Sequence, residues 1–130
     1  MIEILSRGRI SDDDEWVYGY YVCLNCKSHR IYTGFAEVDC GTYYPDVYTI
    51  NPETVGRYTG FTDKNSTKIF EGDIVEAYKY GEEKHIKTIT FRNGCFYFGN
   101  WNFAEFLDKF RLYKVIGNIH DNPELLEENK

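Results

Sequence analysis

The chain has 130 residues, which is enough for one domain or for one small domain with an N-terminal extension. It holds 15 Lys and Arg residues against 21 Asp and Glu residues, so its net charge is -6. This balance argues against a protein that coats nucleic acid without specificity, because such binding depends on neutralising phosphates. Aromatic residues make up 18% of the chain, and since Tyr and Phe favour strands, the composition predicts a mainly β fold.

The first half of the chain predicts two strands. Residues 15–22 and 30–38 are rich in strand-forming side chains, and a polar turn separates them. Residues 41–50 contain Pro45, and we expect them to form an irregular loop that leads to a short extended piece.

The middle of the chain alternates turn and strand signals. Asn51 is a good N-cap before Pro52, and together they predict one helical turn that ends at a left-handed Gly56. An extended run follows, and residues 63–65 are expected to reverse it. Apolar strand character then resumes on both sides of the polar corner at residues 71–73.

The second half predicts short strands joined by tight turns. Asn93-Gly94 is the dipeptide that type I′ hairpins prefer, and it joins two strand-like runs. Asn102 is placed to cap a helix whose apolar residues share one face. The expected strands cover residues 74–80, 85–92, 95–101 and 113–119, and the expected helix covers residues 103–109.

Short strands with one helical turn before the last strand are the layout of a small barrel that closes its own edges. We therefore predict an SH3-like β-barrel over residues 57–119. The whole chain, residues 1–130, is expected to form a single, mainly β domain with a minor helical part. Residues 1–56 are the β-rich N-terminal segment, and residues 120–130 are a tail with a short helix.

Three blocks of the sequence carry a resemblance to a known family. They are EWVYGYYV at residues 15–22, NPETVGRYTGFTDKNSTKIFEGDIV at residues 51–75, and YKVIGNIHDNPELLEE at residues 113–128. With these blocks the chain resembles the YopX family, small proteins encoded mainly by bacteriophages and prophages of low-GC Gram-positive bacteria. It departs from the family at Ser66, where the turn usually has Gly, so we expect this turn either to be strained or to differ in type.

The resemblance implies a β-rich fold with an SH3-like barrel in the second half, a phage or prophage origin and a location in the host cytoplasm. It implies no activity and no catalytic residues. The sequence agrees with a cytoplasmic protein, since it has neither the apolar run of a secretory signal nor the roughly 20 apolar residues of a membrane span. In that compartment the cysteines are expected to be reduced thiols.

Two groups of side chains are candidates for metal binding. Four soft ligands suit tetrahedral zinc, but the second cysteine pair of a zinc ribbon is missing, so small apolar cysteines are the favoured interpretation. Three carboxylates could instead hold a hard cation, although capping of turn amides explains them more simply. The soft ligands are Cys23, Cys26, His29 and Cys40, and the carboxylates are Asp63, Glu71 and Asp73.

Basic and aromatic side chains alternate over residues 78–101. Such a mixture lets small barrels stack bases and contact phosphates. The favoured interpretation is a core of aromatics with a solvated Lys-bearing face, because nearby Glu residues weaken any positive field. The candidate binding residues are Tyr78, Tyr80, Lys84, Lys87, Arg92, Tyr97 and Trp101.

These patterns favour a non-catalytic binding module without a cofactor. Its expected partner is a protein or another copy of itself, because exposed aromatics beyond what a small barrel can bury need an interface. The alternative is a nucleic-acid-binding barrel that uses residues 78–101. A metal-dependent enzyme built on the three carboxylates is the third hypothesis. No membrane partner is expected.

Overall fold

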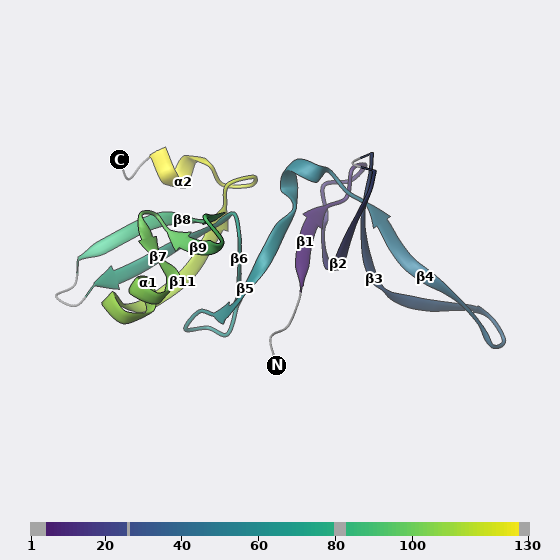
Figure 1. The fold of residues 1–130 in the computed structure, drawn as a ribbon, viewed down its shortest axis with the longest axis horizontal. Coiled ribbons are helices and arrows are strands. Elements are labelled where there is room, and N and C mark those ends of the chain that lie inside the picture. Colours follow the sequence, from purple (N-terminus) through teal and green to yellow (C-terminus); the bar gives the residue numbers. More distant parts are fainter. Residues whose placement is uncertain (1–4, 26, 80–82, 128–130) are drawn as a thin grey trace. The chain divides into compact units, whose positions relative to one another are not determined.

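The structure is a computed structural model that describes residues 5–25, 27–79 and 83–127 (Figure 1). The fold is mainly β, as predicted, with two antiparallel sheets. Contacts within the chain divide it into two compact units, residues 1–58 and residues 59–130. The expected single domain with segments 1–56, 57–119 and 120–130 stays a prediction.

The first sheet has the strand order β4-β3-β2-β1-β5-β6. A 3₁₀ turn, η1, joins β4 to β5, and Asn51 caps it as predicted, with its side chain accepting from the Glu53 amide. The elements are β1 (Ser6–Arg9), β2 (Trp16–Leu24), β3 (Ser28–Asp39), β4 (Thr42–Thr49), η1 (Pro52–Thr54), β5 (Gly56–Thr62) and β6 (Lys68–Phe70).

Two local expectations in this region are wrong. Residues 41–50 were expected to form an irregular loop, but most of them form strand β4. This strand tolerates Pro45 because it lies at the edge of its sheet, where a residue without an N–H group is accepted. The helical turn ends at Val55 in an extended conformation, with φ -65° and ψ 128°, and Gly56 begins β5 instead of taking a left-handed cap.

The second sheet has the strand order β10-β9-β8-β7-β11. Asn93 and Gly94 have φ of 51° and 80°, which confirms the predicted type I′ hairpin. The expected strand at residues 95–101 is interrupted, because Gly99 turns with φ of 60°. The elements are β7 (Asp73–Lys79), β8 (Lys84–Arg92), β9 (Cys95–Phe98), β10 (Trp101–Asn102), α1 (Phe103–Lys109), β11 (Phe110–Asn118) and α2 (Glu124–Glu127).

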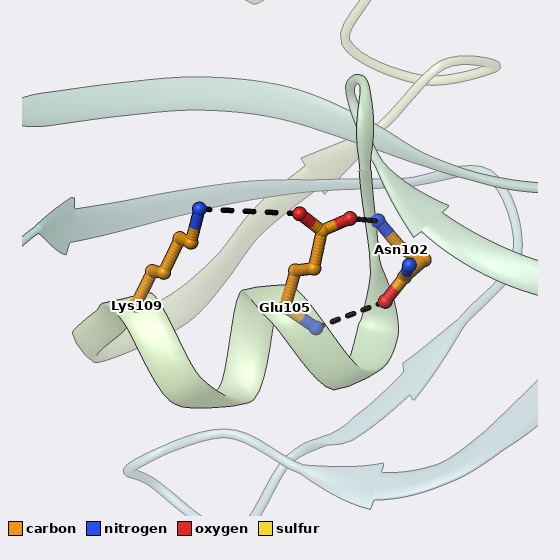
Figure 2. Close-up of polar contacts among 3 residues, drawn as sticks. All are labelled: Asn102, Glu105 and Lys109. Atoms are coloured by element: carbon orange, nitrogen blue, oxygen red, sulfur yellow. Dashed lines mark hydrogen bonds and ion pairs between the residues drawn. The ribbon is translucent and has the colours of Figure 1, made fainter.

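Helix α1 is the predicted capped helix. The Asn102 side chain accepts from the Glu105 amide at 2.9 Å, and the Glu105 carboxylate accepts from the Asn102 amide at 3.4 Å, which is a capping box (Figure 2). Lys109 Nζ lies 3.9 Å from Glu105 one turn further on. The helix buries Phe103 and Phe106 in the core of the second unit.

That core is contiguous and aromatic. It lies between α1 and the inner face of the second sheet, with Phe98 and Phe106 fully buried and their ring centroids 4.6 Å apart. No closed barrel is found among the residues that the structure describes, so the SH3-like barrel stays a prediction. The buried core residues are Ile69, Val75, Ala77, Ile89, Phe98, Phe103, Phe106 and Phe110.

Strand β11 contains a bulge that places a strained side chain in solvent. The register with β7 shifts between Arg111 and Lys114, and Leu112 within the bulge has φ of 47° and is 63% exposed. A left-handed φ costs a non-glycine residue about 1 to 2 kcal/mol. Because the Leu112 side chain is largely exposed, its burial compensates for little of this conformational cost.

We therefore expect Leu112→Gly to raise the free energy of unfolding by about 1 kcal/mol, because Gly adopts this φ without strain. Leu112→Ala keeps the strain and removes only exposed atoms, so it is expected to stay within about 0.5 kcal/mol of wild type. Urea denaturation of the three proteins measures both values. A Gly variant less stable than the Ala variant would show that the bulge is not strained.

Candidate binding surfaces

The strand register divides the predicted basic and aromatic residues between the two faces of the second sheet. Directly paired residues share a face, and successive residues alternate. Tyr78 pairs with Lys84, so both lie on the face away from Val75 and the core, and the register continues this outer face to Arg92 and Tyr97.

Two of the predicted residues lie on the other face. Lys87 pairs with the buried Val75 and shares its side of the sheet at an exposed position. Trp101 packs on Phe98 and Phe110 and lies under Lys79, whose Nζ is 4.7 Å from the ring centroid. Tyr80 lies outside the described residues.

Two cations that the sequence analysis missed join the outer face. Arg111 pairs with Tyr78, and Lys114 pairs with Glu76, so both face the same side as Lys84. Strict alternation along β11 would place Arg111 and Lys114 on opposite faces, and the bulge between them brings both to the same face. On the strands of this face, within the described ranges, four cations accompany one acidic residue, Glu76. The cations are Lys84, Arg92, Arg111 and Lys114.

Both tyrosines of the outer face have a polar partner. Tyr78 donates its hydroxyl to Glu76 at 2.7 Å, and this hydrogen bond raises the pKa of Tyr78. The Arg92 guanidinium lies over the ring of Tyr97 at 4.0 Å and also donates to the Gly99 carbonyl at 3.0 Å. Each tyrosine is thus accompanied by a cation on the same face.

The first sheet exposes an apolar strip along β2. Tyr18, Tyr20 and Leu24 are 47%, 65% and 54% exposed and occupy alternate positions, so they share one face. Half-buried Tyr32 pairs with Tyr20 and extends the strip onto β3. We call this surface the β2 strip; its residues are Trp16, Tyr18, Tyr20, Val22, Leu24, Tyr32 and Val47.

The β2 strip carries arginines at its margins. Arg7 and Arg9 lie over the Trp16 ring, with guanidinium carbons 4.8 and 5.5 Å from its centroid, and exposed Arg30 pairs with Val22. Lys, Asp and Glu do not occur on this face at residues 6–9, 16–24, 28–32 and 47–49.

The opposite face of the first sheet is closely packed. Ile31 and Ile50 are buried there, and a Cβ at Gly8 would lie 2.8 Å from Ile50 Cδ1. A Cβ at Gly19 would lie 2.3 Å from the Tyr32 carbonyl oxygen. Both positions therefore require glycine for the neighbouring residues to lie this close to the backbone. The sequence predicted a strand at residues 15–22. Apolar residues occur on both faces of this strand, so the sequence alone did not indicate which face is exposed.

The three candidate zinc ligands that the structure describes do not come together at one point. Cys23 pairs with His29, but the imidazole Nδ1 is hydrogen-bonded to the Tyr21 hydroxyl at 2.6 Å. Cys40 is exposed just beyond the far end of β3, about 35 Å from His29 at about 3.3 Å per residue. Cys26 lies outside the described residues. Within the described ranges, no three His, Cys, Asp or Glu side chains form a group that could hold a metal ion.

The candidate carboxylates accept hydrogen bonds from turn amides. Asp63 is 7% exposed, and its Oδ1 accepts from the amides of Asn65 and Thr67 at 2.8 and 2.9 Å. Its Oδ2 accepts from the Val115 amide at 2.9 Å, and Asp73 Oδ2 accepts from the Phe70 amide at 2.7 Å. The capping interpretation of these two residues is thus confirmed.

The Asp63 turn also contains the expected strained position. Ser66 has φ of 65°, a left-handed value that Gly adopts more easily. The two Asp63 bonds to Asn65 and Thr67 bracket this residue and hold it in place.

These features define a β-rich protein with two exposed sheet faces that combine tyrosines with cations. A family model described as YopX protein matches residues 7–127, and the chain belongs to the YopX family. The solved structure of protein EF1440 from Enterococcus faecalis is similar: the two chains are 28% identical, with a TM-score of 0.68 over 97% of this chain and 99% of that one. No curated protein matches the chain.

Neither described helix is long and apolar enough to cross a membrane.

Proposed function

We propose that this protein is a non-catalytic binding module that associates with a second copy of itself through the β2 strip. The observation that carries the proposal is the alignment of exposed Tyr18, Tyr20 and Leu24 on one face of one strand. The proposal includes a phage or prophage origin, action in the host cytoplasm and an SH3-like arrangement of the second unit, as the family resemblance implies.

The composition of the β2 strip supports a protein interface. Interface centres are enriched in Tyr, Trp and Arg and depleted of Lys, Glu and Asp. The strip joins three tyrosines and Trp16 to flanking arginines, and no Lys, Asp or Glu lies on this face within residues 6–9, 16–24, 28–32 and 47–49. The largest apolar patch on a typical monomer is often functional.

The charges at the two ends of the strip support a second copy as its occupant. Four exposed acidic residues, 12–15, lie where β2 begins, and exposed Lys27 and Arg30 lie near the point where β2 ends. A twofold axis near Tyr20 would place the acidic end of one copy against the basic end of the other. Such isologous dimers are the commonest form of self-association.

The size of the strip predicts a weak dimer. Residues 16–24 span about 26 Å at about 3.3 Å per residue, and two strands together are about 10 Å wide. The apolar strip is therefore of the order of 300 Å² per copy, and the polar margins bring the interface only to the lower end of specific complexes. We expect a dissociation constant in the micromolar range.

Sedimentation velocity over a range of concentrations tests the dimer. We expect the wild-type chain to dimerise with concentration, and the double variant Tyr18→Ser and Tyr20→Ser to stay monomeric. Leu112→Ser is the matched control, since Leu112 is equally exposed but lies in the second unit. A wild type that stays monomeric at the highest concentration, or a control that dissociates equally, would overturn the proposal.

Charge exchange tests the twofold arrangement. Arg30→Glu is expected to weaken dimerisation about tenfold, because it opposes the acidic turn of the second copy, and Asp13→Lys in the same chain is expected to restore it. Lys64→Glu, an exposed reversal in the second unit, is expected to have no effect. Failure of the double variant to recover would contradict the antiparallel pairing of the two strips.

A further inference from the structure

We propose that the outer face of the second sheet binds single-stranded nucleic acid at two separate pairs of tyrosine and cation. This surface is different from the β2 strip, so the inference goes beyond the proposed self-association. It changes the sequence hypothesis for residues 78–101, because the register removes Lys87 and Trp101 from the face and adds Arg111 and Lys114.

The first pair is centred on Tyr78. The register places Lys84 beside it on β8 and Arg111 beside it on β11, so cations flank the tyrosine on both neighbouring strands. Lys114 pairs with Glu76 one step further along the same face. The Tyr78 hydroxyl is held by Glu76, which fixes the ring while leaving it half-exposed for stacking.

The second pair is Arg92 and Tyr97. It lies on the same face at the far end of β8. Tyr97 is opposite Thr90, six residues from Lys84, which places its ring position about 20 Å away at about 3.3 Å per residue. The guanidinium plane over Tyr97 is itself a surface on which a base can stack.

The centre of this face is covered by the chain itself. Ile74 is fully buried, and a Cβ at Gly117, which pairs with it, would lie 2.5 Å from the side-chain oxygen of Asn122. Helix α2 contacts β8. The two pairs are therefore separate contact points, which a mononucleotide cannot reach together and a flexible oligonucleotide can.

The composition of this face favours phosphate over protein. The strands of this face carry two lysines and two arginines against one glutamate, in a chain whose net charge is -6. Lysines are depleted at the centres of protein interfaces but contact phosphates well. Two half-exposed tyrosine rings on a sheet suit unpaired bases, whose faces are open to stacking.

Fluorescence anisotropy with a labelled oligothymidylate of about 12 nucleotides tests the site. At low salt we expect the wild type to bind, and Lys84→Glu with Arg111→Glu to bind at least tenfold more weakly. The salt slope of the variant should be shallower by about 1 to 2, since about 0.7 is lost per phosphate contact. The matched control, Lys64→Glu with Lys109→Glu, changes the net charge equally and is expected to keep wild-type affinity.

Stacking is tested by a second pair of variants. Tyr78→Leu is expected to lower affinity by about fivefold or more, whereas Tyr78→Phe keeps the ring and most of the affinity. Circular dichroism confirms that each variant is folded. Absence of wild-type binding at low salt, equal losses in the face and control variants, or full competition by free thymidine monophosphate at matched phosphate concentration would each overturn the proposal.

Discussion

Replacing Asp63 by alanine is expected to lower the free energy of unfolding by about 3 to 5 kcal/mol. The buried carboxylate accepts three backbone N–H groups, from Asn65, Thr67 and Val115, and so joins the 63–67 turn to strand β11. Alanine leaves all three donors without their acceptor and releases Ser66 from its left-handed conformation. The loss also weakens the attachment of this turn to β11 at Lys64, whose amide donates to the Tyr113 carbonyl.

Chemical denaturation measures this loss, and two further variants identify its cause. Asp63→Asn keeps one acceptor oxygen but turns an amide group toward the remaining donors, so it is expected to lose about 2 to 3 kcal/mol. Asp108→Asn, an exposed aspartate on α1, is expected to change stability by less than about 0.5 kcal/mol. If Asp63→Ala were as stable as Asp108→Asn, the carboxylate would not be the link between turn and strand.

Phe106→Ala is expected to have the second large effect, a loss of about 3 to 5 kcal/mol. Phe106 is fully buried, and its ring centroid lies within 5.4 Å of those of Phe98, Phe103, Phe110 and Tyr113. Truncation leaves a cavity that rigid aromatic neighbours fill poorly. Helix α1 then loses one of the two buried residues that attach it to the sheet.

Thermal unfolding followed by near-ultraviolet circular dichroism reports this core directly, because aromatic packing dominates that signal. Phe61→Ala is the comparison, since Phe61 is 43% exposed at the margin of the same cluster, where its ring lies 5.5 Å from Phe103. Its expected loss is about 1 kcal/mol. Equal losses of stability in Phe106→Ala and Phe61→Ala would show that Phe106 is not at the centre of the core.

Local signals predicted the elements where one residue determines the backbone. Asn93-Gly94 adopts the positive φ values of its hairpin type, and Asn102 caps α1 with Glu105 as its partner. Pro45 predicted a loop where the chain forms β4, because a proline that disrupts a central strand is acceptable at a sheet edge, and edge position is a tertiary property.

The candidate surfaces depended on register, which the sequence does not show. Trp101 belongs to the predicted aromatic set but faces the core. Arg111 lies on the same outer face as Lys114 because a bulge between them adds one residue to β11 relative to β7. Tyr18 and Tyr20 were part of a correctly predicted strand, yet apolar neighbours at Val17 and Tyr21 concealed which of its faces is exposed. Pairing partners along β2 resolve the two faces.

Cross-linking at Tyr20 tests the central proposal of self-association most directly. Tyr20 lies midway along the β2 strip, so an isologous dimer brings the two copies of this residue together near its twofold axis. In a chain whose four cysteines are replaced by serine, Tyr20→Cys is expected to form disulfide-linked dimers under mild oxidation, while Leu112→Cys stays monomeric. Equal cross-linking at the two positions, or none at Tyr20, would contradict the proposed interface.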